Sequence, residues 1–209
     1  MWNIGDMTTE KNNALLLVVS APSGAGKSTL CNRLIKKFPG MAYSVSCTTR
    51  APRGKEKDGE HYHFLSRDEF LKRVDAGEFL EHAEVHGNFY GTLKSTVRRA
   101  LDEGCDLIMD IDVQGAAQIR SACSALPEED PLRRNFVDVF IAPPSLEELE
   151  KRLRGRATDC EEVIRKRMCN AKREMEQMEV YAHCIINDNL DDAVEKFVNI
   201  ICMERIKRD

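Results

Sequence analysis

The stretch ALLLVVSAPSGAGKSTL at residues 14–30 decides the fold class. Residues 14–20 form an apolar run as long as one buried strand, and residues 27–37 have the pattern of a helix. Between them lies a turn with Gly24 and Gly26, where the backbone can approach a ligand closely. A strand, a glycine turn and a helix in this order are typical of phosphate-binding loops, whose backbone N–H groups and helix N-terminus bind anionic oxygens.

Two side chains at the start of this helix have the chemistry that bound phosphates require. Lys27 can neutralise β- and γ-phosphate oxygens, and the Ser28 hydroxyl can bind Mg²⁺ as a cofactor. The general pattern GxxxxGK[ST] is broken at one place, since Ala21 stands where the first glycine belongs. The stretch still predicts a site for a nucleoside triphosphate, formed by Ala21, Pro22, Ser23, Gly24, Ala25, Gly26, Lys27, Ser28 and Thr29.

Outward from this loop, strand-like apolar runs alternate with helical patterns. We expect further strands at 43–46, 105–111, 136–141 and 184–186, helices near 113–123 and 145–153, and a closing amphipathic helix at 190–206. This alternation predicts an α/β fold with a parallel sheet covered by helices on both faces.

Two segments interrupt the alternation. Residues 50–90 contain a charged loop, strands at 62–65 and 79–85, and a helix announced by the capping box Ser66-Arg-Asp-Glu69. An arginine-rich insertion follows at about 154–169, whereas 127–135 resembles a plain surface connection. The domain prediction is a core of 14–46 and 93–209 that includes this lid, a lobe of 47–92, and an N-terminal extension of 1–13. Such a core with two insertions is the geometry of enzymes that close over a substrate.

The composition excludes several classes of protein. Of 209 residues, 42% are hydrophobic and 32% are charged, which is the balance of a globular chain and not of a disordered one. No apolar run is long enough to span a membrane, and the first residues lack a secretion signal, so we expect a cytoplasmic protein. The net charge of −4 argues against general nucleic-acid binding. The eight cysteines are scattered without a CxxC pair, which predicts buried reduced thiols.

A proline-containing segment supplies two arginines, Arg50 and Arg53, and Pro52 keeps this segment out of a helix. Two guanidinium groups at this spacing can bind one phosphate monoester from two sides. Tyr62 and Tyr90 each lie near a glycine turn and can donate phenol O–H bonds to the same phosphate. Each residue alone has an ordinary explanation as a solvated or packed side chain, so the prediction of a phosphate-acceptor site rests on their combination.

Several independent motifs, in order along the chain, closely resemble the guanylate kinase family. They are SAPSGAGKST (20–29), VSCTTRAPR (45–53), DGxxYxF (58–64), GEFLExAEVHGNxYGT (77–92), LIMDIDVQG (107–115) and IAPPSLEELEKRLRGR (141–156). The resemblance covers over 90% of the chain and implies transfer of the γ-phosphate of ATP to GMP, and also to dGMP, giving ADP and GDP. The expected partners are therefore these small molecules, without nucleic acid or membrane, in a monomer or weak homo-oligomer.

The resemblance also implies roles for individual residues of this chain. The guanine base is expected to face Ser46, Glu81 and Thr92, with Arg50, Arg53, Tyr62 and Tyr90 on the GMP phosphate and Asp112 as a further GMP contact. Lys27, Arg53, Arg152, Arg156 and Arg167 are the implied catalytic residues, and Asn187 and Asp188 the implied contacts to the adenine side of ATP. Ser28 and Asp110 are the implied metal site, with a structural role for Asp110 as the alternative. Arg154, Arg165, Lys166 and Arg173 are interpreted as solvated.

The chemistry of guanine supports this assignment independently. Guanine presents N1–H and the 2-amino group side by side, so one carboxylate can accept both bonds, while a hydroxyl can donate to O6. The chain departs from the family pattern at Lys55, His61 and Ala157. Two alternatives stay open: an interaction module that binds phosphopeptides, which the intact phosphate loop disfavours, and a kinase for another phosphorylated acceptor, which Ser46 and Glu81 disfavour.

Overall fold

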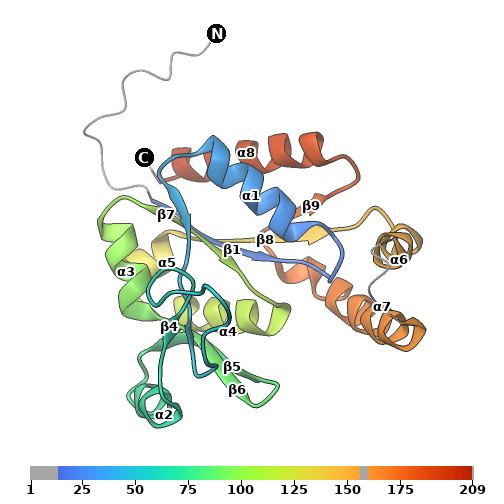
Figure 1. Ribbon diagram of the computed structural model, residues 1–209. Coiled ribbons are helices and arrows are strands. Elements are labelled where there is room, and N and C mark those ends of the chain that lie inside the picture. Colours follow the sequence, from blue (N-terminus) through green and yellow to red (C-terminus); the bar gives the residue numbers. More distant parts are fainter. Residues whose placement is uncertain (1–13, 156–159, 209) are drawn as a thin grey trace.

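The computed structural model describes residues 14–155 and 160–208 (Figure 1). At its centre is a five-stranded sheet in the order β2-β7-β1-β8-β9, in which every neighbouring pair of strands is parallel. The strands are β1 (Leu16–Ser20), β2 (Met41–Tyr43), β7 (Asp106–Asp110), β8 (Phe136–Ala142) and β9 (His183–Ile186). Because the strands are parallel, their carboxyl ends lie at one edge of the sheet. At this edge Val19 of β1 pairs with Asp110 of β7.

Helices cover both faces of this sheet, as the alternating pattern predicts. Leu17 and Val19 pack in one hydrophobic cluster, whereas Leu16 and Val18 pack in another, since successive side chains of a strand point to opposite faces. The first cluster includes side chains of α1 (Lys27–Lys37) and α8 (Leu190–Ile206), and the second those of α3 (Lys94–Asp102), α4 (Val113–Ser124) and α5 (Pro131–Arg134).

A second sheet lies below the first in Figure 1, in the order β4-β3-β6-β5. Its elements are β3 (Cys47–Thr48), β4 (His63–Phe64), α2 (Arg67–Asp75), β5 (Phe79–Val85) and β6 (Asn88–Leu93). They have a small hydrophobic core of their own, in which the rings of Phe70 and Phe79 stack with centroids 4.3 Å apart. We call this unit the acceptor lobe, after the phosphate-acceptor site that the sequence predicts in it.

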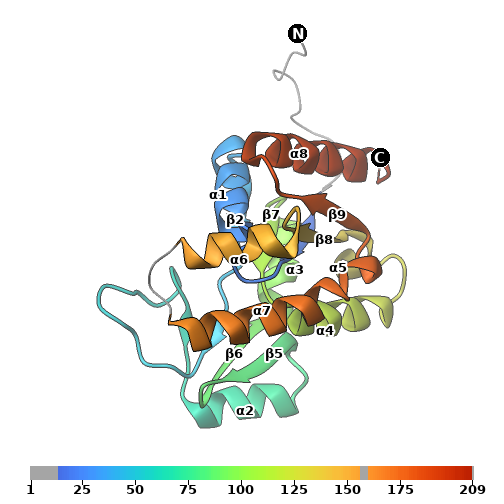
Figure 2. The same cartoon turned by 90° about the vertical axis from the view of Figure 1, so that its right-hand side faces the viewer.

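Two helices, α6 (Leu146–Arg154) and α7 (Glu161–Met175), pack against each other beside the central sheet, and we call them the lid helices (Figure 2). The short 3₁₀ helix η1 (Met178–Val180) leads from α7 back to β9. Leu149, Leu153 and Ala171 are fully buried between the lid helices. Arg154 is not merely solvated as expected, because its guanidinium bonds to Glu150 of α6 and Glu161 of α7.

The structure corrects several expectations drawn from the sequence. The strand expected at 43–46 lies at Met41–Tyr43, and the expected strand at 62–65 shrinks to His63–Phe64. Segment 127–135 is not a plain connection, because it contains α5, whose Leu132 is fully buried. The thiols are not all buried: all eight are free, but Cys160, Cys169, Cys184 and Cys202 are exposed. Within the described ranges, no helix is long and apolar enough to cross a membrane.

Candidate functional site

The turn between β1 and α1 has the backbone geometry that a phosphate loop needs. Gly24 and Gly26 have φ angles of 99° and 92°, in the left-handed region that L side chains rarely adopt. The outer side of Gly24 is also occupied, since a Cβ there would lie 2.9 Å from a methyl carbon of Leu153 and 3.1 Å from one of Leu149. The first lid helix therefore packs against the loop from outside, while the loop's inner side lines a cavity of about 360 Å³.

Asp110, at the carboxyl end of β7, joins the two polar side chains that follow the loop. Lys27 Nζ lies 2.6 Å from Asp110 Oδ1 and also donates to the carbonyl oxygen of Ile111 at 2.7 Å. Ser28 Oγ donates to Asp110 Oδ2 at 3.0 Å. A hydroxyl and a carboxylate this close are hard oxygen ligands of the kind Mg²⁺ prefers, and Mg²⁺ usually takes few protein ligands besides phosphate and water. The residues present therefore fit a Mg²⁺ site.

The cavity at the phosphate loop is also lined by two carboxylates, and we call it the donor cavity because the sequence predicts the triphosphate site here. Asp112 caps the N-terminus of α4 by accepting the Gly115 N–H at 2.8 Å, and it lines this cavity together with Glu174 of α7. Burial raises the pKa of Glu174, the nearby Asp112 raises it further, and Lys27 opposes both effects. The sequence analysis missed Glu174 because its position on a charged helix does not reveal that it faces the loop.

The three residues predicted to face the guanine base come together where strands far apart in the sequence meet. The hydroxyls of Ser46 and Thr92 lie 3.1 Å apart, and Glu81 pairs with Thr92 across the β5–β6 ladder. Glu81 is only 8% exposed; burial raises the pKa of its carboxyl group, while a hydrogen bond from Thr92 opposes the rise. A Cβ at Gly115 would lie 3.5 Å from Asp112 Oδ1 and 3.6 Å from Glu81 Oε2, so both carboxylates face the start of α4.

Arg50 and the two tyrosines form a compact group next to these residues. The rings of Tyr62 and Tyr90 meet edge to face with centroids 6.0 Å apart, and the Arg50 guanidinium lies 5.3 Å from the Tyr62 centroid. Arg50 donates to Glu56 Oε1 at 2.9 Å, which raises the pKa of the arginine. Glu56 also accepts the backbone N–H of Arg53 at 2.7 Å, and the rest of Arg53 is exposed. Glu56 thus holds the Arg50 guanidinium and the backbone of Arg53, two contacts that the sequence did not reveal.

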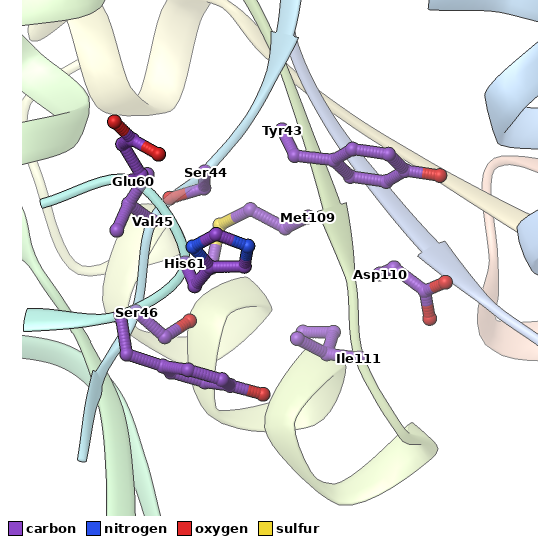
Figure 3. Close-up of a pocket in the computed structure, with 10 residues that line it drawn as sticks. Tyr43, Ser44, Val45, Ser46, Glu60, His61, Met109, Asp110 and Ile111 are labelled. Atoms are coloured by element: carbon purple, nitrogen blue, oxygen red, sulfur yellow. The ribbon is translucent and has the colours of Figure 1, made fainter. Parts of the chain in front are cut away.

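Two of the predicted acceptor residues, Ser46 and Tyr62, share a cavity of about 480 Å³ with the end of β7 (Figure 3). It is lined by Tyr43, Ser44, Val45, Ser46, Glu60, His61, Tyr62, Met109, Asp110 and Ile111. His61, one of the departures from the family pattern, lies in it with Nδ1 accepting the Lys57 N–H at 3.2 Å. Asp110 therefore contacts the phosphate loop through Lys27 and also borders the acceptor cavity.

One of the three implied lid arginines reaches the phosphate loop, and a second contacts the residue that follows β9. Arg152 Nη1 donates to the carbonyl oxygen of Asn187 at 2.9 Å, and Arg167 Nη1 donates to Ser23 Oγ at 3.5 Å. Arg156, like the family departure at Ala157, lies outside the described residues.

The residues expected on the adenine side differ from each other in environment. The Asn187 amide is buried, and its Nδ2 donates to the carbonyl oxygen of Ala25 at 2.7 Å. Asp188 is exposed. The side chain of Asn187 is thus directed at the phosphate loop itself, which the sequence alone did not indicate.

Comparisons with known proteins agree with this architecture. A model of the guanylate kinase family matches residues 13–204. A guanylate kinase of Cereibacter sphaeroides is 50% identical over 195 residues, which cover 93% of this chain and 89% of that protein. One of Syntrophotalea carbinolica is 48% identical over 194 residues, covering 93% and 88%. The crystal structure of guanylate kinase from Anaplasma phagocytophilum has a TM-score of 0.65 at 34% identity, covering 93% of this chain and 88% of that one.

Proposed function

The chain belongs to the guanylate kinase family, and on this premise we propose that it transfers the γ-phosphoryl group of Mg·ATP to GMP, giving ADP and GDP. The proposal rests mainly on the location of Asp110 between the phosphate loop and the acceptor cavity. Its carboxylate bonds to Lys27 of the phosphate loop, and it lines the cavity that also contains Ser46 and Tyr62. The donor and acceptor sites therefore adjoin at one edge of the sheet, as direct transfer between two nucleotides requires.

On the donor side, backbone N–H groups of residues 21–26 and the N-terminus of α1 bind the phosphates of ATP. An ammonium group has three N–H donors, and Lys27 uses two of them on Asp110 and on the Ile111 carbonyl. Its third donor is left for an oxygen between the β- and γ-phosphates. Ser28 and Asp110 would hold Mg²⁺, which when bound neutralises charge that develops on the phosphate oxygens.

On the acceptor side, Glu81 accepts the N1–H and 2-amino hydrogens of guanine, and Ser46 donates to O6, with Thr92 fixing both side chains. Arg50, Arg53, Tyr62 and Tyr90 bind the GMP phosphate, and Asp112 is a further GMP contact. The strong pairing of Arg50 with Glu56 keeps the guanidinium in place before the substrate arrives.

The lid arginines complete the charge balance. Phosphoryl transfer leaves little covalent work for the protein, so positioning and charge neutralisation supply most of the catalysis. Arg152 and Arg167 lie on the lid helices, and Arg156 follows the first of them in the sequence. Arg167 already contacts Ser23 of the loop, and Arg152 contacts the carbonyl oxygen of Asn187. Closure of the lid helices would bring them onto the transferring phosphates and exclude water.

The proposal is tested by an assay of ADP formation with ATP and, in turn, GMP, dGMP, AMP, UMP or dTMP. We expect turnover with GMP and with dGMP, and at least about 10³-fold lower kcat/KM with AMP, because AMP would leave the Glu81 carboxylate unpaired. A preference for another monophosphate would identify a kinase of a different acceptor. Tight phosphopeptide binding without any turnover would instead indicate an interaction module.

A further inference from the structure

Asn187, the residue directly after β9, has all of its backbone polar groups and its amide nitrogen bonded. Its N–H donates to the Ala142 carbonyl at 2.8 Å, and its carbonyl accepts from Arg152 of the first lid helix at 2.9 Å. Its side-chain Nδ2 donates to the Ala25 carbonyl at 2.7 Å. The side chain is thus fixed between the last strand and the phosphate loop, and it is only 6% exposed.

The packing at Gly26 shows how closely the Asn187 amide approaches the loop. A Cβ at Gly26 would lie 2.4 Å from Asn187 Nδ2, a distance that no real side chain tolerates. Gly26 lines the donor cavity, whereas Asn187 does not. The amide therefore fills the outer side of the loop, opposite the side on which the phosphates would bind.

This contact fixes the direction of one backbone N–H. Ala25 C=O and Gly26 N–H belong to the same trans peptide, so the two groups point in opposite directions. Gly26 can adopt φ of either sign at little cost, so this peptide is free to flip unless its carbonyl is held. The bond from Asn187 holds that carbonyl outward, and the Gly26 N–H must then point inward to the donor cavity.

We propose that Asn187 is a positioning residue for the phosphate loop, which holds the Ala25–Gly26 peptide so that the Gly26 N–H faces the donor phosphates. Its contribution is thus to the binding of the phosphate chain and not to recognition of the adenine base. The bond from Arg152 to the Asn187 carbonyl ties the same residue to the first lid helix. The inference rests on the proposed donor site at this loop.

The test compares two ligands that share a phosphate chain but not a base. Binding of Mg·ATP and of Mg·tripolyphosphate is measured by calorimetry for the wild type, N187D and N187L, with N199D as a matched control on the exposed side of α8. Aspartate cannot donate to the Ala25 carbonyl, and leucine removes the donor without adding charge. We expect both variants at Asn187 to weaken both ligands by the same factor, about tenfold or more. The affinity for GMP serves as a control for correct folding of the acceptor lobe. In N187L we expect it to stay within about twofold of the wild-type value.

Three results separate the possibilities. Weaker ATP binding with unchanged tripolyphosphate binding would overturn the inference and assign Asn187 to the base. Unchanged binding of both ligands in N187L would overturn it as well. If the wild type itself bound neither ligand, the proposed donor site would be refuted. This result differs from the two above, which refute only the role of Asn187.

Discussion

Glu81 is the residue on which, in the proposed function, the choice of acceptor depends. Its buried carboxylate can accept two hydrogen bonds from guanine, and Glu81→Gln keeps the shape but replaces one acceptor with a donor. We expect kcat/KM for GMP to fall by an amount equivalent to about 2–4 kcal/mol, and the GMP/AMP ratio to narrow, because the new NH₂ can face adenine N1. Measurement of kcat/KM for both nucleotides checks this. An unchanged ratio would show that Glu81 does not contact the base.

The environment of Glu81 also predicts a pH dependence. Burial raises the pKa of this carboxyl group above the ordinary glutamate value of 4.5. Only the ionised form accepts both guanine bonds, so GMP affinity is intact well above the raised pKa and is lost as the pH falls through it. As the pH is lowered, we expect the affinity of the wild type for GMP to begin to fall at a pH above 4.5. We expect the Glu81→Gln variant to lack the part of this pH dependence that comes from Glu81. Identical pH profiles for the two proteins would contradict the assignment.

Substitution of Lys27 tests the proposed ATP site. Lys27→Ala removes the ammonium that bridges Asp110 and the phosphate loop, and we expect kcat to fall by about 10³-fold or more. The affinity for GMP, measured by calorimetry, should change far less because the acceptor lobe is separate. Lys37→Ala, in the last turn of the same helix, is the control and should retain normal turnover. Near-normal turnover of Lys27→Ala would refute the phosphate-loop assignment.

At the scale of residues, the sequence suggested candidate side chains but not how they are held in place. Ser46 and Thr92 were both expected at the base, but their 3.1 Å contact depends on strand pairing between distant segments. Glu56, Glu174 and the inward direction of the Asn187 amide were not predicted. Each depends on how a loop or helix packs in three dimensions, which leaves no periodic trace in the chain.

Among the elements, those with strong local signals were predicted closely. Both α1 and α8 have the expected bounds, since apolar periodicity and flanking signals define them. The helix α5 was missed because its four residues are too short for a periodic pattern, and only tertiary packing buries Leu132. The strand expected at 43–46 lies two residues earlier because its pairing with β7, which joins Met41 to Asp106, fixes the register.

The position of Arg167 on α7 predicts that its removal affects kcat far more than either KM. The helix α7 brings Arg167 to within 3.5 Å of the phosphate loop at Ser23 Oγ, where full contact with the phosphates requires closure. We expect Arg167→Ala to lower kcat by on the order of 10²-fold while either KM changes only a few-fold, because the interaction strengthens in the transition state. Arg165→Ala, an exposed neighbour on the same helix, is the control. A wild-type kcat for Arg167→Ala would show that this guanidinium does not act on the transferring phosphate.

At the scale of the whole molecule, a cluster of charged side chains around Glu204 stabilises the packing of the last helix. Glu204 of α8 bonds to His183 at 3.0 Å, Lys207 at 2.5 Å and Arg208 at 2.7 Å. Arg208 also donates to the Arg134 carbonyl next to β8. Burial alone would raise the pKa of Glu204, but these three partners lower it to about 2. The cluster thus ties the last helix to the central sheet.

The Glu204 cluster predicts the response of stability to mutation and pH. We expect Glu204→Gln to lower the free energy of unfolding at pH 7 by about 1–3 kcal/mol. Because the folded pKa lies below the ordinary value of 4.5, the contribution is complete above pH 4.5 and is lost as the pH falls toward 2. Urea denaturation at pH 7 and pH 3 checks this. A difference between wild type and variant that did not shrink at the lower pH would contradict it.

The central claim for the molecule is that donor and acceptor sites adjoin, so that the γ-phosphoryl group of ATP is transferred to GMP and not to water. The most direct measurement is the fate of the label when the wild-type protein is incubated with Mg²⁺, GMP and ATP labelled at the γ-phosphate. The account predicts that the label appears in the β-phosphate of GDP, with inorganic phosphate a minor product. Label found chiefly in inorganic phosphate, or retained in ATP, would contradict it.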